Sequence, residues 1–437
     1  MMKERSFKVI AGPLNERGYV TATSFQELEV NYKRQPSTIY ILGMLPGEEG
    51  IVKTFKTKRE IFYAHVVEFT KKSIDRVEPK DIESYLASSP LQIFSDPAEL
   101  NFKKEFISKF FNTSVEVVDS IDSWGYRNKV EFGFYEDYEN YNLYLSFFKR
   151  EGNSGKYILT NGTSIADSKI NNLGLQVVEI LRNNKVSGKS LKSLLIRSTN
   201  QEVIGSLYVT VNDLFIQYPK LEDQLSTLPI SIIFSDKKSP ASINNGFLKE
   251  YKSILTQSIL NMEFDLALDG FFQINIPTFE KVIIQVKEFL EQRSISGTLL
   301  DLYCGVGVIG QLLASNFESV IGVDSSLESE LLSNLNSKKN NIKNFEYIRS
   351  EAEKIVELIT SDKILFLDPP RIGCNQKIID RINDQKPEYV FYLSCNPVTQ
   401  ARDYELLQDN YSLELIKSYN FYPQTPHLEN LLILKKK

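Results

Sequence analysis

The residue with the clearest chemical potential is a cysteine that follows a short apolar run near the C-terminal end. Tyr389 to Leu393 has the β-branched and aromatic character of a buried strand and leads into Ser394-Cys395-Asn396-Pro397. The proline ends strand pairing, and the residues after it indicate the start of a helix. Open α/β sheets place their chemistry at the carboxyl ends of their strands, so the Cys395 thiol is a candidate nucleophile. The alternative is a small buried cysteine with no reaction to perform.

A glycine-rich turn follows an earlier predicted strand, residues 297–302. The segment GVGVIG at residues 305–310 fits the pattern GxGxxG and precedes a predicted helix, whose N-terminus presents free N–H groups to a ligand. Asp324 ends the next predicted strand and is placed to hold ribose hydroxyls. Asp301, before the first glycine, favours an S-adenosylmethionine site over a dinucleotide site. A glycine-rich turn without a ligand is the third alternative.

Two carboxylates complete the set of candidate residues. Asp368 ends the run Leu365 to Leu367 and is followed by Pro369-Pro370, which would fix it over the ligand cleft. Glu429 begins the last predicted strand, just after His427. A partly buried carboxylate has a raised pKa and can accept a proton, so Glu429 is the candidate base and His427 the second choice. The alternatives are a Pro-Pro strand terminator and an exposed strand-end glutamate.

A thiol, a methyl donor and a separate base together permit one specific reaction. Carbon 5 of uracil or cytosine is a poor nucleophile, but a thiolate that adds to carbon 6 makes carbon 5 reactive toward a methyl sulfonium. A base must then remove the carbon-5 proton before the thiolate leaves. Cys395 and Glu429 are the side chains that this scheme requires.

The composition indicates a multidomain protein of a reducing compartment. The chain has 437 residues, too many for one core, and no apolar run approaches the roughly 18 residues that span a bilayer. Its 3 cysteines are far apart and its 2 histidines cannot build a His-rich metal site, so we expect no metal and a cytoplasmic location. With a net charge of -5, nucleic-acid binding would require a locally basic face.

Three regions differ in their predicted secondary structure. Residues 1–72 contain five short β-rich runs, which predict a small oligonucleotide-binding barrel with basic positions around residues 53–59. That charge fits a solvated lysine face and an RNA-binding face equally well. Residues 73–250 are α+β in character, and Trp124 to Phe134 interleaves aromatic and basic side chains, as single-stranded nucleic-acid sites do. Residues 251–437 alternate strands and helices, which predicts a parallel, doubly wound sheet.

One amphipathic helix is predicted between the barrel and the aromatic segment. Glu99 to Phe111 has helical spacing, with its leucine, isoleucine and phenylalanines on one side. Its lysines, Lys103 among them, are expected away from that apolar side.

These motifs resemble those of the RNA uracil-5-methyltransferase family, which makes 5-methyluridine in transfer and ribosomal RNA with S-adenosylmethionine. The resemblance covers nearly the whole chain. Residues 8–70 are similar to the family's TRAM domain, an RNA-binding barrel, and Ser394-Cys395-Asn396-Pro397 with the distant His427-Leu428-Glu429 is the most specific match. The other matching segments are Tyr126-Arg127-Asn128-Lys129, Phe272-Gln273-Ile274-Asn275, Asp301 to Gly307 and Asp368-Pro369-Pro370-Arg371.

The resemblance implies a fold and a set of site residues. It implies an α/β protein with an OB-like TRAM barrel at residues 1–72, a central α+β RNA-binding domain at 73–250 and a doubly wound, Rossmann-like methyltransferase domain at 251–437. Cys395 would be the nucleophile and Glu429 the proton acceptor. The implied cofactor-binding residues are Gln273, Tyr303, Gly305, Gly307, Asp324, Glu351 and Asp368. The implied RNA contacts are Arg127, Lys129, Phe272 and again Asp368.

The resemblance also implies partners. The target uridine would be flipped out of its stack into the cleft. Many long members of the family carry an iron–sulfur cluster on cysteines after the TRAM domain, but residues 76–99 contain no cysteine, so we expect no cluster. The TRAM domain favours 23S ribosomal RNA over transfer RNA as substrate, and we expect a monomer with no membrane association. The alternatives from other classes are a nicotinamide-dependent oxidoreductase that uses residues 305–310 and a non-catalytic RNA-binding protein.

Overall fold

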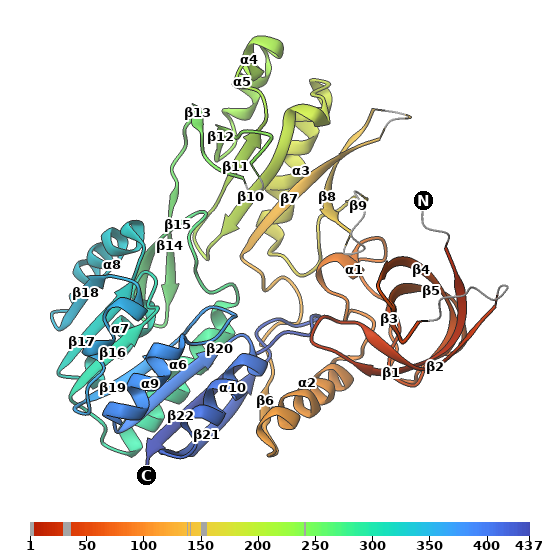
Figure 1. The fold of residues 1–437 in the computed structure, drawn as a ribbon. Helices are drawn as coiled ribbons and strands as arrows, with labels where there is room; N and C mark the ends of the chain where they lie inside the picture. Colours follow the sequence, from red (N-terminus) through yellow and green to blue (C-terminus); the bar gives the residue numbers. More distant parts are fainter. Residues whose placement is uncertain (1–3, 29–35, 138, 140, 150–154, 240–241) are drawn as a thin grey trace.

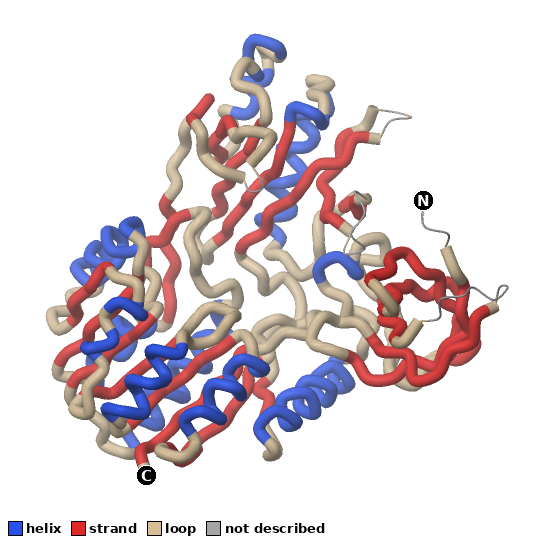
Figure 2. Tube along the Cα trace, in the orientation of Figure 1, coloured by secondary structure: helices blue, strands red, loops and turns tan. Residues whose placement is uncertain are grey.

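Three units make up the fold (Figure 1). The computed structural model describes residues 4–28, 36–137, 139, 141–149, 155–239 and 242–437. The units are a closed N-terminal barrel, a seven-stranded central sheet and an eight-stranded C-terminal sheet. Figure 2 shows that the barrel consists of strands and loops, whereas several helices cover the C-terminal sheet. The predicted fold class is therefore confirmed. In the described part of the chain, no helix has the length and apolar character needed to cross a membrane.

The barrel contains the five strands predicted from the turn pattern, in the order β1-β2-β3-β5-β4. Alternate side chains fill its interior, as Phe7, Val9 and Val52 do. The buried Glu48 carboxylate accepts hydrogen bonds from Arg76 Nε and one terminal nitrogen, each at 2.6 Å, and so ties the barrel to the segment that follows it. The strands are β1 Ser6–Leu14, β2 Val20–Glu27, β3 Thr38–Leu42, β4 Glu49–Lys58 and β5 Ile61–Lys71.

The central unit is a mixed sheet in the order β13-β12-β11-β10-β7-β8-β9, in which only β11 and β12 pair in parallel. Its long helix α3 packs on the sheet through an apolar stripe that includes Ile170, Val177 and Leu181. The strands are β7 Lys129–Glu136, β8 Leu143–Phe148, β9 Lys156–Leu159, β10 Leu191–Ser198, β11 Val203–Val209, β12 Ile230–Phe234 and β13 Gly246–Lys249. The helices are α3 Ser168–Asn183, α4 Leu214–Gln217 and α5 Leu221–Leu225. A separate hairpin, β14 Ile254–Ile259 and β15 Met262–Ala267, leads into the C-terminal unit.

The C-terminal sheet has the order β18-β17-β16-β19-β20-β22-β21-β6. The first five strands of this order, β18-β17-β16-β19-β20, pair in parallel, as predicted. Strand β22 instead pairs antiparallel with β20 and with β21. The strands are β16 Thr298–Leu302, β17 Ser319–Asp324, β18 Phe345–Arg349, β19 Lys363–Leu367, β20 Tyr389–Ser394, β21 Tyr411–Tyr419 and β22 Glu429–Lys436. The helices are α6 Ile276–Gln292, α7 Val308–Leu313, α8 Leu327–Lys339, α9 Gln376–Gln385 and α10 Pro397–Leu407.

Helices cover both faces of the C-terminal sheet. Alternate residues of the strands point to opposite faces, so Phe391 packs with α6 and α7 while Tyr392 packs with α9 and α10. This two-sided burial explains why the predicted strands are continuous apolar runs rather than alternating ones. Because β16, β19 and β20 are parallel neighbours, their carboxyl ends lie together at one edge of the sheet.

Part of the segment assigned to the central domain lies with the C-terminal sheet instead. Strand β6 Glu116–Val118 pairs in parallel with β21, and helix α2 Asp96–Phe111 packs against α10. The short helix α1 Tyr85–Ser88 lies nearer the barrel (Figure 1). The boundaries predicted at residues 72 and 250 stay predictions. Residues 96–118 fall between these boundaries, but they pack with the C-terminal sheet.

Helix α2 contains a fully buried ion pair, contrary to the expectation that Lys103 lies away from the apolar side. Lys103 Nζ donates to Glu99 Oε1 at 2.6 Å, to Asn420 Oδ1 at 2.5 Å and to the Tyr422 carbonyl at 3.1 Å. Both Glu99 oxygens accept from the backbone N–H of Gln424 at 3.0 Å. Burial raises the pKa of Glu99 and lowers that of Lys103, and each charge partly offsets the other's shift. The pair therefore holds the loop between β21 and β22 against α2.

We predict that removing the lysine charge alone destabilises the protein. Lys103→Met keeps the side-chain length but leaves the buried Glu99 carboxylate unpaired, which should cost about 3–5 kcal/mol. Urea unfolding followed by circular dichroism measures this as a lower midpoint. The double variant Lys103→Met/Glu99→Gln should recover most of the loss, because it buries no charge. Lys104→Met, an exposed neighbour, is the control, and a Lys103→Met midpoint equal to that control would contradict the prediction.

Candidate active site

The turn after β20 presents Cys395 at the carboxyl edge of the sheet. Pro397 begins α10, and the Asn396 side chain caps this helix by accepting from the Val398 N–H at 3.2 Å. The Asn396 amide also donates to the Arg371 carbonyl at 2.8 Å, which fastens this turn to the one after β19. The thiol between Ser394 and Asn396 is half-buried. Cys304 and Cys374 are buried, as expected of small core residues.

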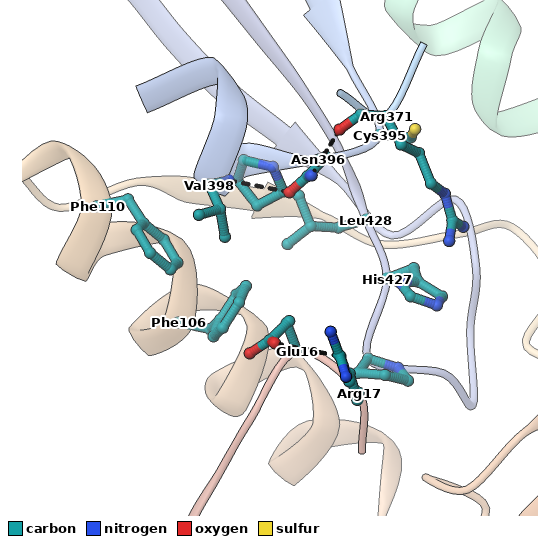
Figure 3. Close-up of a pocket in the computed structure, with 12 residues that line it drawn as sticks. Glu16, Arg17, Phe106, Phe110, Arg371, Cys395, Asn396, Val398, His427 and Leu428 are labelled. Carbon is teal, nitrogen blue, oxygen red and sulfur yellow. Dashed lines mark hydrogen bonds and ion pairs between the residues drawn. The ribbon is translucent and has the colours of Figure 1, made fainter. Parts of the chain in front are cut away.

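Cys395 lines a cavity of about 490 Å³ between the barrel and the C-terminal sheet (Figure 3). Phe106 and Phe110 of α2 form one side, and His427 lies with Cys395 on the other. Arg17, in the turn between β1 and β2, closes the cavity from the barrel. The barrel therefore contributes a wall to the cavity that holds the thiol.

The Cys395 thiol is protonated at neutral pH. Burial raises its pKa to about 12, and the Glu429 carboxylate adds to the shift. The Arg371 side chain opposes it by charge and by a hydrogen bond to the thiol, and Figure 3 shows the two residues side by side. Arg371 is therefore the cation that stabilises the thiolate form.

Glu429 begins β22 as a buried carboxylate. Its side chain accepts one hydrogen bond, from the Tyr422 hydroxyl to Oε1 at 2.8 Å, while Oε2 has no partner among the residues that the structure describes. Burial and then the neighbouring Asp368 charge raise the pKa of Glu429 well above its usual range. A buried carboxyl with one unoccupied oxygen has the properties required of a proton acceptor.

Asp368 links this group to a second, smaller cavity. Burial raises the pKa of Asp368 to about 7, and its charge acts on both Cys395 and Glu429. The enclosed part of the second cavity measures about 30 Å³. Its lining includes Phe272, Gln273, Tyr303, Gly305 and Asp368, as well as Phe271.

This smaller cavity offers open backbone and polar side chains to a ligand. Gly305 has a φ of 55°, and a Cβ added there would meet no atom within 4 Å, so the backbone is open to a ligand. The Gln273 amide and the Asp368 carboxylate supply polar groups on the same side. Because 30 Å³ encloses only a small group, the rest of such a ligand would lie along the mouth of the cavity.

Of the other predicted cofactor residues, two shape the glycine loop and one lies outside the enclosed cavity. Asp324 Oδ2 accepts from the Gly305 N–H at 3.1 Å, so this carboxylate shapes the loop directly. Gly307 has a φ of 79°, and a Cβ there would come within 2.5 Å of Ser333 Oγ. Glu351 is exposed and pairs with Lys354 at 3.0 Å, outside the enclosed cavity.

The segment Tyr126-Arg127-Asn128-Lys129 holds other loops in place. Lys129 Nζ donates to the carbonyls of Asp269 and Gly270 at 2.5 and 3.0 Å, and burial lowers its pKa to about 8. The Asn128 amide donates to the Gln273 carbonyl at 2.9 Å. The Lys129 ammonium is thus engaged with the loop before α6, whereas the charge of Arg127 reaches Tyr422 beside Glu429.

Several residues of the site were not identified from the sequence. One is Phe271: the resemblance implied its neighbour Phe272 as an RNA contact, but Phe272 is buried, whereas Phe271 is 75% exposed. Arg371 belongs to a recognised segment, so its charge next to two prolines was the available signal. Tyr422 and Arg17 carry no local signal, because their loops reach the site only through tertiary packing. Within the described residues, no group of three or more metal-binding side chains gathers.

Comparisons with known proteins identify the family and the fold. The family model described as tRNA (uracil-5-)-methyltransferase matches residues 96–437. A protein of Enterococcus faecalis named "uncharacterized RNA methyltransferase" is 28% identical over 91% of this chain and 92% of its own length. A protein of Prochlorococcus marinus with the same name is 29% identical over 90% of this chain and 99% of its own length. The solved structure of Pyrococcus abyssi tRNA (uracil-54, C5)-methyltransferase with S-adenosyl-L-homocysteine has a similar fold, with a TM-score of 0.77 at 20% identity over 98% of this chain and 100% of that one.

We predict that Arg371 controls the reactivity of Cys395. Arg371→Ala removes the cation that opposes the raised thiol pKa, so this pKa should rise further and the thiolate fraction at pH 8 should fall, about tenfold for each pKa unit. The rate of alkylation by iodoacetamide should fall in proportion. Peptide-resolved mass spectrometry measures the rate at each cysteine. Arg349→Ala, which removes a half-exposed arginine on β18, is the control. Equal alkylation of Cys395 in both variants would contradict the assignment.

Proposed function

Because the chain belongs to the tRNA (uracil-5-)-methyltransferase family, we propose that it methylates carbon 5 of a specific RNA uridine through a covalent Cys395–uracil adduct. The observation that carries this proposal is the cluster of Cys395, Glu429 and Asp368 at the carboxyl edge of the sheet. A nucleophile, a base and a polar anchor meet there next to a cavity large enough for part of a nucleotide. Nothing in this arrangement calls for hydride transfer.

Cys395 would act first. Its thiolate, stabilised by Arg371, adds to carbon 6 of the uracil, and the electron pair of the carbon 5–carbon 6 double bond moves onto carbon 5. There it is shared with the carbonyl oxygen on carbon 4 and is available to form the bond to the methyl group. Bound S-adenosylmethionine supplies the methyl group on a positively charged sulfur. Asp368 lines the smaller cavity, and its charge acts on Cys395 in the larger one, so it would accept a hydrogen bond from the edge of the base or from the methyl donor.

Glu429 would act last. Its unoccupied Oε2 takes the carbon-5 proton, the electrons of that C–H bond restore the carbon 5–carbon 6 double bond, and the carbon 6–sulfur bond breaks with its pair on Cys395. His427 lines the same cavity and stays the second candidate base.

The methyl donor would lie over the glycine loop. Gln273, Tyr303, Gly305 and Asp368 line the small cavity, and Asp324 and Gly307 shape the loop from behind. Glu351 is the weakest of the proposed contacts because its carboxylate already pairs with Lys354. The Pyrococcus abyssi neighbour, which has the same fold, was solved with S-adenosyl-L-homocysteine.

The RNA would enter from the barrel side. Arg17, Phe106 and Phe110 line the larger cavity, and a flipped uridine could reach Cys395 through it. On the barrel, the half-buried rings of Tyr40 and Tyr63 lie 5.6 Å apart, with Phe55 6.4 Å from Tyr63, and such a row suits base stacking. Arg127 and the exposed Phe271 are the proposed contacts on the other side, whereas the Lys129 ammonium is occupied by backbone carbonyls. We also propose a monomeric, cytoplasmic enzyme.

We propose 23S ribosomal RNA as the substrate, with transfer RNA as the second candidate. The resemblance of the barrel to a TRAM domain is the reason for proposing ribosomal RNA. The row of aromatic rings on the barrel supports contact with RNA beyond the target loop. The observation that favours transfer RNA is the Pyrococcus abyssi protein, which is named for transfer RNA and whose fold matches 98% of this chain, barrel included. The barrel fold alone therefore does not separate the two substrates.

We predict that Glu429→Gln accumulates a covalent protein–RNA adduct. The amide cannot accept the carbon-5 proton, so the methylated uracil stays bonded to Cys395 and migrates with the protein on a denaturing gel. Cys395→Ala should form no adduct and transfer no methyl group, although it should bind S-adenosylmethionine with the affinity of the wild type in calorimetry.

Two outcomes would contradict the scheme. Methyl transfer by Cys395→Ala would remove the covalent role of the thiol. Product release at the wild-type rate by Glu429→Gln would remove the role of Glu429 and favour His427.

We predict that methylation is confined to one uridine in one RNA class. Unmodified 23S ribosomal RNA and bulk transfer RNA are incubated separately with the enzyme and labelled S-adenosylmethionine, and 5-methyluridine is mapped by nuclease digestion and mass spectrometry. Label at a single 23S position is expected. Label in transfer RNA alone would replace the proposed substrate, and label in neither RNA would contradict the proposed activity.

A further inference from the structure

The proposed base receives its one hydrogen bond from a tyrosine in the loop between β21 and β22. The Tyr422 hydroxyl lies 2.8 Å from Glu429 Oε1. The Glu429 side chain is 4% exposed, and its Oε2 has no partner among the described residues. The tyrosine therefore occupies one carboxylate oxygen and leaves the other available.

Buried contacts from two other segments fix the backbone around Tyr422. The Tyr422 carbonyl accepts from Lys103 Nζ at 3.1 Å, and the Gln424 N–H donates to Glu99 at 3.0 Å, so α2 holds the loop at two points. The Tyr126 hydroxyl donates to the Pro423 carbonyl at 2.9 Å, which adds a third point from the segment before β7. A side chain that extends from a backbone held at three points can impose an orientation on its partner.

The surroundings of Glu429 explain why a donor is needed. Asp368, at the end of β19, places a negative charge near it, and Cys395, at the end of β20, adds another when ionised. Arg371, in the turn after β19, supplies a positive charge, and Tyr422 is the one neutral donor to this carboxylate among the described residues. A hydrogen bond to the charged form of a buried carboxyl favours ionisation, and the base must be ionised to accept a proton.

We propose that Tyr422 is a positioning residue for proton abstraction, holding Glu429 Oε1 so that Oε2 faces the carbon-5 proton of the adduct. This rests on the proposed covalent function. Tyr422 exchanges no proton with the substrate in this account. The proton moves from carbon 5 to Oε2, its bonding electrons restore the ring double bond, and the Cys395 thiolate leaves.

Tyr422→Phe tests the proposal because it removes only the hydroxyl. The hydrogen bond to a charged partner should be worth roughly ten- to a hundredfold in the elimination step, so kcat falls by that factor while the KM for RNA changes by less than about twofold. The covalent adduct should then become visible in steady-state turnover. Loss of the hydrogen bond also raises the pKa of Glu429 further, because that bond lowers it in the wild type. Activity requires the ionised base, so the rising limb of kcat against pH should move to higher pH.

Tyr411→Phe is the matched control. Its hydroxyl donates to the Pro387 carbonyl at 3.0 Å, so the change also deletes one buried tyrosine hydrogen bond, but at the opposite edge of the sheet. It should leave kcat, the adduct level and the pH profile unchanged. The proposal is overturned if Tyr422→Phe behaves like this control, or if it raises the KM without accumulating adduct or moving the pH limb.

Glu429→Gln, assayed in parallel, separates this proposal from the proposed function. If Glu429→Gln traps the adduct while Tyr422→Phe turns over normally, only the positioning role fails. If Glu429→Gln turns over normally, the assignment of the base fails and the Tyr422 proposal fails with it.

Discussion

The burial of three groups that become negatively charged, Asp368, Cys395 and Glu429, is the constraint on which the site depends. Burial raises the pKa of each. The Asp368 charge raises the pKa of Glu429 further, and the charges of Glu429 and Asp368 raise that of Cys395, so ionising all three together is unfavourable. Arg371 offsets part of this cost for both the thiolate and the Glu429 carboxylate, and the Tyr422 hydroxyl offsets part of it for the carboxylate. We infer that the thiolate and the carboxylate are needed at different steps, the first at attack on carbon 6 and the second at release, which lets one small site use both.

The positions of these groups depend on parts of the chain that lie far away in sequence. The Lys103–Glu99 pair on α2 anchors the loop that carries Tyr422, and residues 126–129 anchor both that loop and the loop before α6. The barrel adds Arg17 to the cavity wall. The three units therefore meet at the site, and a change in α2 or in the central segment should reach the chemistry through loop position rather than through contact with the substrate.

Local sequence patterns were enough to predict much of this. The family and the enzyme class are confirmed by the match over residues 96–437, and the oxidoreductase alternative finds no support there. Strand ends and prolines placed Cys395 and Asp368 at one edge, because these signals act within a few residues. Glu429 was predicted only to begin a strand, and it reaches the same edge because β22 runs antiparallel to β20. The errors concern side chains whose partners are distant: Lys103 is buried because Asn420 and Tyr422 meet it, and Lys129 bonds to carbonyls 140 or more positions away. The antiparallel strand β21 and the short β6 were missed because they form only on an existing sheet.

The central claim is the covalent bond between Cys395 and the target uracil. RNA in which 5-fluorouridine replaces uridine tests it directly, because the fluorine at carbon 5 cannot leave as a proton does and the reaction stops at the methylated adduct. The wild-type enzyme, incubated with this RNA and S-adenosylmethionine, should yield a denaturation-resistant complex. After nuclease and protease digestion, mass spectrometry should find the peptide containing Cys395 bonded to a methylated fluorouridine nucleotide. Turnover of ordinary RNA without any such adduct, or an adduct on another residue, would contradict the account.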